Sequence, residues 1–194
     1  LKEQARDAHV TPFIWVLSAF QTLLHRYSGE DSIAVGSPMA CRLSLDYQLL
    51  AGHFTNPVLL VARFDPHRLF KELLYENKDQ LLLAMKYQEY PLQCLLEDLQ
   101  PLRENPTAPL FQTVVSWNQM QDDGSGHTLV EQVVMTGQRG AVYDLVLTGY
   151  DRGDTIDLSL RFNTDIFTRA TVERISRHLL SILEQTCANS NAIV

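Results

Sequence analysis

LLAGHFTNPVLLVAR, residues 49–63, places Gly52, Phe54 and Asn56 at alternate positions immediately before an unbroken apolar run. Glycine permits tight turns, and short amide side chains hydrogen-bond nearby backbone groups, so these residues predict a shaped loop. The run at residues 58–62 predicts a strand with both faces covered, as inside a sheet packed by helices. The stretch therefore favours a loop that leads into a buried strand.

Helices are predicted where apolar residues recur at intervals of three and four. Thr11 and Pro12 supply an N-cap and a proline suited to the first turn, and Gly29 follows the end of the first apolar pattern. Proline likewise begins the second and third helices at Pro66 and Pro91. The expected helices span residues 12–28, 66–89, 91–101 and 168 or 171 to 187.

Strands are predicted where the alternation becomes two-fold or the residues are β-branched, and residues 36–46 lack any period and predict a loop. The sequence DRGD at residues 151–154 separates two such segments and predicts a hairpin. The expected strands are residues 32–35, 58–62, 111–117, 128–135, 142–150 and 155–162. No linker divides the chain, so residues 1–194 are expected to form one α+β lobe, a mixed sheet flanked by helices.

Composition restricts the classes of protein to consider. The chain has 194 residues, 45% of them hydrophobic, and a net charge of −7 without a basic stripe, which argues against nucleic acid as a partner. No apolar run approaches the ~20 residues that cross a membrane, so no membrane association is expected. Cys41, Cys94 and Cys187 are far apart and lack the spacing of a metal site or a disulfide framework, which favours a reducing cytosol. Leu1 in place of methionine indicates a piece of a longer protein.

Further motifs follow residues 49–63 at regular distances. They are YQEYPLQCLLEDLQP from Tyr87, LRENPTAPLFQ from Leu102, YDL from Tyr143 and FNTDIF from Phe162. In this order the motifs resemble the condensation domains of nonribosomal peptide synthetases, whose later motifs read roughly GxFVN, HQDxPFE, RxxxxxPLFQ and YNTDLF. The resemblance implies a chloramphenicol-acetyltransferase-like fold of two lobes around a cleft, of which this chain is the C-terminal lobe.

The resemblance also implies a reaction. In the family an acyl or peptidyl group passes from one carrier protein's thioester to an amine on another, and both substrates arrive on phosphopantetheine arms. The family's catalytic motif, HHxxxDG, lies in the first lobe, and none of the six histidines here has a histidine neighbour. We therefore expect no catalytic residue, metal or directly bound cofactor in this chain. Its expected partners are the N-terminal lobe and the donor and acceptor carrier proteins.

Four candidate residues for the wall of the substrate tunnel lie in the first motif. Gly52, Phe54 and Asn56 match GxFVN, and His53 occupies its variable position. Asn56 either faces the tunnel or satisfies loop backbone groups, and the sequence favours the second role. A tunnel-facing catalytic role for His53 is the less favoured interpretation of this residue.

Three more candidates come from the later motifs. Gln88 is retained where the family has HQD, whereas Tyr87 replaces the histidine and is expected to be structural. Arg103 either holds a phosphate of an incoming arm or forms a surface ion pair. Asp144 in YDL and Asp165 in FNTDIF lie at strand ends, but nothing in the sequence places them in one site. Asp165 is expected to end a strand or cap a turn.

The sequence leaves other functions open. Within the family, an epimerisation domain shares the fold; outside it, a non-catalytic scaffold module and a small free-standing acyltransferase are the alternatives. Removal of a partner lobe is expected to expose an apolar face, and therefore to cause weak self-association, with pairing of edge strands as one route. The residues expected on that face are Val114, Val130, Val133 and Val134.

Overall fold

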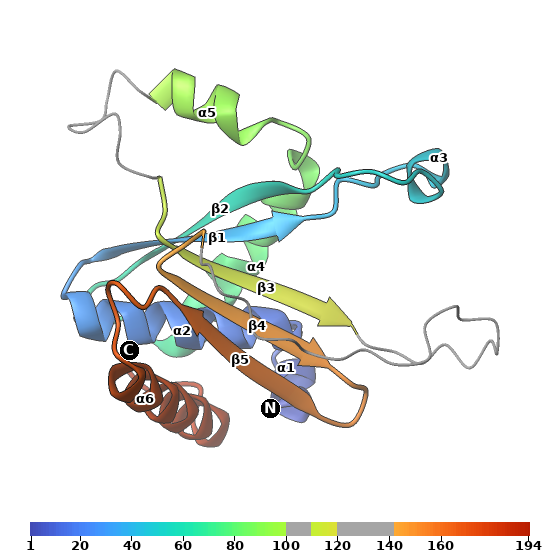
Figure 1. Cartoon of the computed structure of the whole chain (residues 1–194). Helices are drawn as coiled ribbons and strands as arrows, with labels where there is room; N and C mark the ends of the chain where they lie inside the picture. The colour runs from blue at the N-terminus through green and yellow to red at the C-terminus, as the bar shows by residue number, and fades with distance from the viewer. Residues whose placement is uncertain (100–109, 120–141) are drawn as a thin grey trace.

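A mixed β-sheet forms the centre of the molecule in the computed structural model, which describes residues 1–99, 110–119 and 142–194 (Figure 1). The strands lie in the order β2-β1-β3-β4-β5. β1 pairs antiparallel with β2 and parallel with β3, whereas β4 pairs parallel with β3 and antiparallel with β5. The strands are β1 (Ser32–Met39), β2 (Asn56–Arg63), β3 (Thr113–Gln119), β4 (Leu145–Asp151) and β5 (Ile156–Phe162). The expected α+β fold with a mixed sheet flanked by helices is confirmed.

Helices cover one face of this sheet. The main core joins apolar side chains of α2, α4 and α6 to the inward side chains of the strands. Trp15 and Phe70 meet in this core with ring centroids 5.5 Å apart. The helices are α1 (Lys2–Asp7), α2 (Pro12–Ser28), α3 (Leu45–Gln48), α4 (Phe70–Lys86), α5 (Leu92–Leu99) and α6 (Arg169–Ala188). The fold is therefore held together mainly by hydrophobic burial between helices and sheet.

A smaller apolar cluster lies on the opposite face of the sheet. Phe111, Val114 and Val146 are buried there, and Leu92 at the start of α5 packs against them. Val114 is only 5% exposed, so the expectation that it lies on an uncovered apolar face is wrong. The reason is local: Phe111 and its neighbours cover this part of the sheet. Val130, Val133 and Val134 lie outside the described residues.

The first and last long helices follow the sequence pattern closely. The Thr11 hydroxyl accepts a hydrogen bond from the Ile14 backbone N–H, and Gly29 ends α2 in the left-handed conformation that glycine adopts without strain. At α6 the Thr168 hydroxyl caps the Thr171 N–H. Local capping residues are thus sufficient to set these boundaries.

Several features of the strands and helices differ from those expected. β1 continues to Met39 because its residues pair with β2 as far as Asn56, and α3 follows within the expected loop. β2 is an edge strand and not an interior one, with only Leu60 and Ala62 buried. The short helix α1 at the N-terminus was not expected.

The start of α4 is displaced by contacts that are distant in sequence. Asp65 forms a separate turn by accepting the His67 N–H through its carboxylate, and the helix begins only at Phe70. The N–H groups of Phe70 and Lys71 donate to backbone carbonyls of the C-terminal tail, at Ala192 and Ser190. These carbonyls satisfy donors at the first turn that a local side-chain cap would otherwise serve.

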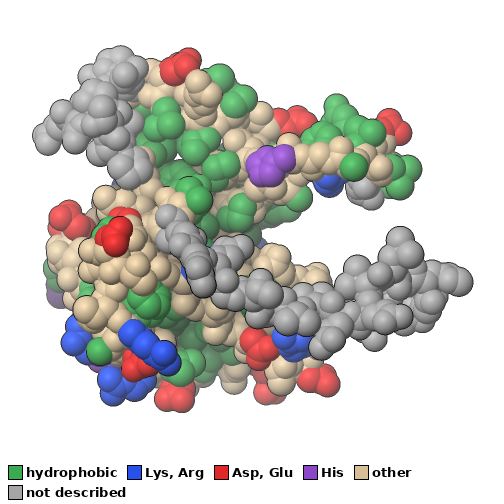
Figure 2. All heavy atoms as spheres, viewed as in Figure 1, with side chains coloured by type: hydrophobic (Ala, Val, Ile, Leu, Met, Phe, Trp, Pro, Cys, Tyr) green, Lys and Arg blue, Asp and Glu red, His purple; other side chains and the backbone are tan. Residues whose placement is uncertain are grey.

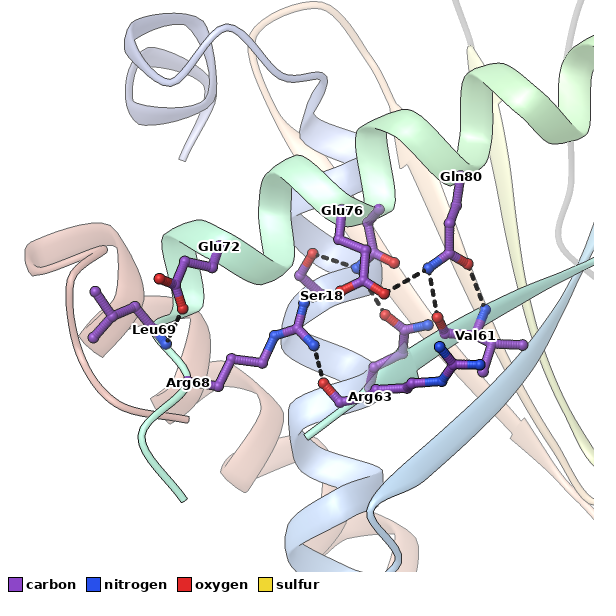
Figure 3. A network of polar contacts seen from close by, with 10 residues as sticks. Ser18, Val61, Arg63, Arg68, Leu69, Glu72, Glu76 and Gln80 are labelled. Atoms are coloured by element: carbon purple, nitrogen blue, oxygen red, sulfur yellow. Dashed lines mark hydrogen bonds and ion pairs between the residues drawn. The ribbon is translucent and has the colours of Figure 1, made fainter. Parts of the chain in front are cut away.

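Side chains also occupy the outer edge of β2 (Figure 3). Gln80 of α4 accepts the Val61 N–H at 2.9 Å and donates to the Val61 carbonyl at 2.6 Å. Arg68 donates to the Arg63 carbonyl and pairs with Glu76. Burial of the Arg68 guanidinium lowers its pKa from the ordinary value. Backbone groups that point away from the sheet are therefore satisfied by α4 and the turn before it.

Candidate functional site

The segment between β1 and β2 projects from the body of the molecule (Figure 1). We call residues 40–55, which include α3, the arm. Hydrophobic side chains gather on its outer surface (Figure 2). The exposed large ones are Leu43, Leu45, Tyr47, Leu49 and Leu50, of which Leu49 is 91% exposed. An apolar group of this kind marks a surface suited to contact with another protein.

Arg42 organises the arm from within. Its guanidinium donates hydrogen bonds to the carbonyl of Leu50 at 2.8 Å and to that of Gly52 at 3.1 Å, and also to that of Tyr47. The same guanidinium lies 4.4 Å from the centroid of the Phe54 ring, a cation–π contact. The first-motif candidates Gly52 and Phe54 thus help to shape the arm. No local pattern in the sequence singles out Arg42 for this role.

Asn56 fixes the base of the arm to the turn between α4 and α5. Its side-chain amide donates to the carbonyls of Gln88 at 2.9 Å and Tyr90 at 2.7 Å. Its side-chain oxygen accepts the Leu92 N–H, at 3.1 Å, at the first residue of α5. All three partners are backbone groups, as the interpretation of Asn56 as a loop-satisfying residue expects. The amide therefore positions two motifs relative to each other.

Gln88 completes the same junction and is 7% exposed. Its side chain donates to the Met85 carbonyl at 2.8 Å and accepts the Cys41 N–H at 3.3 Å. Cys41 has a positive φ of 50°, and its thiol lies 3.2 Å from the Gln88 carbonyl oxygen. We call this group of Cys41, Asn56 and Gln88 the clasp. Sequence reasoning missed Cys41, whose role depends on a partner 47 residues away.

A second polar contact connects the clasp to α5. The Tyr90 hydroxyl donates to an Asp98 carboxylate oxygen at 2.6 Å. This hydrogen bond is the main cause that raises the pKa of Tyr90 above its ordinary value of 10.0, because ionisation would remove the donated proton. Tyr90 therefore stays a neutral donor at physiological pH and holds α5 near the junction.

The remaining candidates do not join the clasp. His53 is an exposed residue of the arm, and within the described residues it makes no hydrogen bond or ion pair. Asp144 is half-buried at the start of β4, where its backbone links Gln112 and Asn163. Arg103 lies outside the described residues. Asp165 is exposed, and it is Asn163 that caps the turn by accepting the Asp165 N–H at 3.0 Å.

The phenylalanine of the third motif lies directly on β1. A Cβ atom added to Gly36 would come within 2.3 Å of the Phe111 ring, so only glycine fits this position without a shift. Phe111 also stacks on Tyr143 of the YDL motif, with centroids 5.5 Å apart. The third and fourth motifs thus pack together on the face of the sheet that α5 approaches.

Neither a metal centre nor a membrane-spanning helix is found in the described part of the chain. Among residues 1–99, 110–119 and 142–194, no three His, Cys, Asp or Glu side chains are grouped to hold a metal ion. Nor does any helix in these ranges combine the length and the apolar character needed to cross a bilayer. The motif residues instead fix the arm, the α4–α5 turn and the sheet relative to one another.

Known proteins resemble the chain over nearly its whole length. It is 31% identical over 199 residues to surfactin synthase subunit 2 of Bacillus subtilis (strain 168) and 30% identical over 191 residues to bacitracin synthase 1 of Bacillus licheniformis. These alignments cover 98% and 95% of the chain, but only 5% and 4% of the two synthases.

A solved structure and a family model give the same result. The condensation domain of the monacolin K polyketide synthase MokA superposes with a TM-score of 0.80 at 25% identity, over 98% of this chain and 44% of that one. The family model for the condensation domain matches residues 1–194. The chain therefore belongs to the condensation-domain family.

Proposed function

We propose that the chain is the C-terminal lobe of a condensation domain in a synthetase that makes nonribosomal peptides or hybrid polyketide–peptides. One observation carries this proposal: the family model matches all 194 residues, while the chain corresponds to 44% of a solved condensation domain. In the assembled domain, an acyl or peptidyl group is transferred from a carrier-bound thioester to a carrier-bound amine. The products are a new amide bond and a free thiol on the donor arm.

The contribution of this lobe is to shape one wall of the site. Asn56 and Gln88 use their side chains to hold backbone groups, so their role is positioning. His53 has an exposed side chain on the arm and remains a candidate for contact with substrate, together with Arg103 and Asp144. No residue of this chain is assigned as the base.

The apolar surface of the arm is the reason to propose the N-terminal lobe as a partner. Its outer surface carries five exposed large apolar side chains, while Arg42 and Phe54 hold its shape from inside. Burial of apolar area drives most protein association, so a preformed apolar projection is suited to a permanent contact. The first lobe of the same domain is the partner for which such a contact would be permanent.

Carrier proteins and their phosphopantetheine arms are the remaining proposed partners. The matched synthases belong to peptide synthesis, in which carrier-bound thioesters are the substrates of condensation. We propose that phosphopantetheine enters only as the arm of these carriers and that the chain binds no cofactor directly. All three cysteines are free thiols, consistent with a proposed location in the reducing cytoplasm.

An assay of amide formation tests the proposal. The synthetase that contains this chain and the 194-residue chain alone are each mixed with a donor carrier loaded with an acyl thioester and an acceptor carrier loaded with an aminoacyl thioester. Mass spectrometry of the acceptor arm detects the condensed product. We expect product with the synthetase and none above the uncatalysed level with the chain alone.

Other outcomes would assign a different function. Turnover by the isolated chain would contradict its role as a non-catalytic lobe, and loss of that turnover in His53→Ala would identify the base. Exchange of the α-proton in deuterated water without condensation would favour an epimerisation domain. An inactive synthetase without HHxxxDG in the segment before Leu1 would favour a scaffold module.

A further inference from the structure

A groove between α2 and α6 lies away from the arm and the clasp. It has a volume of about 670 Å³, and the C-terminal residues Ala192–Val194 form one of its sides. In Figure 1 the C-terminus is seen beside these two helices. The groove lies on the helical side of the sheet, whereas the motifs of the proposed function lie at the arm and around Phe111. It therefore requires a separate explanation.

The charge of this groove is opposite to that of the chain. Arg26 and Arg174 line it together with His178, and none of its lining side chains is acidic. The chain as a whole carries 23 Asp and Glu against 16 Lys and Arg. Neither arginine takes part in an ion pair or hydrogen bond with the rest of the described chain. Both guanidinium groups are thus available for a carboxylate.

The interior of the groove is suited to a polypeptide more than to a small ion. Leu23 is buried at its base, and Ile182 and Ile193 add apolar surface. Tyr27 is held by a 2.9 Å hydrogen bond between its hydroxyl and His178 Nδ1, which fixes a polar wall. The volume is within the range of sites that bind ligands much larger than a phosphate. Apolar base, polar wall and cationic rim together match a segment that alternates acidic and apolar side chains.

We infer that this groove binds an acidic amphipathic polypeptide segment, with apolar side chains against Leu23 and Ile182 and carboxylates paired with Arg26 and Arg174. The guanidinium–carboxylate pair is the geometry that arginine supports best, through two parallel N–H donors. Both arginines are exposed, so each pair contributes modestly, and the apolar contacts supply the remainder of the affinity.

Fluorescence anisotropy with the 194-residue chain tests this inference. The probe is a labelled octapeptide of alternating glutamate and leucine. The variant Arg26→Gln/Arg174→Gln is compared with Arg6→Gln/Arg63→Gln, which removes the same charge from exposed arginines outside the groove. We expect the groove variant to bind about tenfold more weakly and the control variant to stay within about twofold of the unmodified chain.

Further measurements separate the possible occupants without using condensation activity. Raising NaCl from about 50 to about 500 mM is expected to weaken binding by the unmodified chain far more than by the groove variant, because salt screens exposed pairs. Equal binding by both variants, or no binding of the peptide, would overturn the inference. Displacement of the peptide by equimolar inorganic phosphate would overturn it in favour of a small-anion site. Self-association that is lost in the groove variant, without peptide binding, would overturn it in favour of a second copy.

Discussion

Replacing Asn56 by alanine is expected to lower the free energy of unfolding by about 2 kcal/mol. The side chain makes hydrogen bonds to the backbone of Gln88, Tyr90 and Leu92. Each such bond contributes about 1 kcal/mol net, and the bond to the Tyr90 carbonyl is solvent-exposed, so water can replace it. The other two are part-buried, and their loss accounts for the expected value.

Urea unfolding of the chain measures this quantity. The matched control is Asn118→Ala, an exposed asparagine in β3, which should change the free energy of unfolding by less than about 0.5 kcal/mol. Hydrogen exchange gives a local reading of the same contact. The Leu92 amide should exchange faster in Asn56→Ala, because its acceptor is removed, while amides in the middle of α2 keep their protection.

One result would refute the assignment of Asn56 as a positioning residue. If Asn56→Ala kept full stability and normal Leu92 exchange, yet condensation by the intact synthetase fell severely, Asn56 would act on the substrate itself. Loss of stability together with a proportional loss of activity would agree with the clasp as described.

Two further predictions concern positions outside the clasp. Gly149→Ala places a Cβ within 2.3 Å of the Trp117 ring and is expected to cost about 1–3 kcal/mol, measured by thermal unfolding; an unchanged melting temperature would contradict this packing. The hydrogen bond from the Lys2 ammonium lowers the pKa of the Asp151 carboxyl below its ordinary 3.8, so the stabilisation is complete above that value and is lost as the pH falls through the folded pKa. The melting temperatures of the unmodified chain and Asp151→Asn should therefore differ at about pH 7 and converge below pH 3.8; a difference that does not change with pH would oppose this.

Features that depend on neighbouring residues could be predicted from the sequence. Thr11, Gly29 and Thr168 mark helix ends through their own hydrogen bonds or backbone angles, and the structure has those ends within a residue of the expected positions. The hairpin around Gly153 is of the same kind, because its turn and its flanking alternation are contiguous. Local signals were sufficient in each case.

Features that depend on distant residues could not be predicted. Pro66 suggested a helix start, but the acceptors for the first N–H groups of α4 come from Ser190 and Ala192. The position of β2 at the edge of the sheet follows from strand order, which its apolar sequence does not encode. The same holds for the site: the loop-satisfying role of Asn56 was expected, but its partners lie 32 to 36 residues further along the chain.

The hydrogen bonds between Gln80 and Val61 have a consequence for how this lobe can aggregate. An unprotected edge strand acts as a template that recruits a strand from another molecule. Here the Gln80 side chain already makes hydrogen bonds to both the N–H and the carbonyl of Val61. Arg68 donates to the Arg63 carbonyl, and Pro57 has no backbone N–H. Recruitment along β2 would first have to displace α4 side chains. Extension of the sheet by a second copy at the β2 edge is therefore obstructed by side chains that the fold itself supplies.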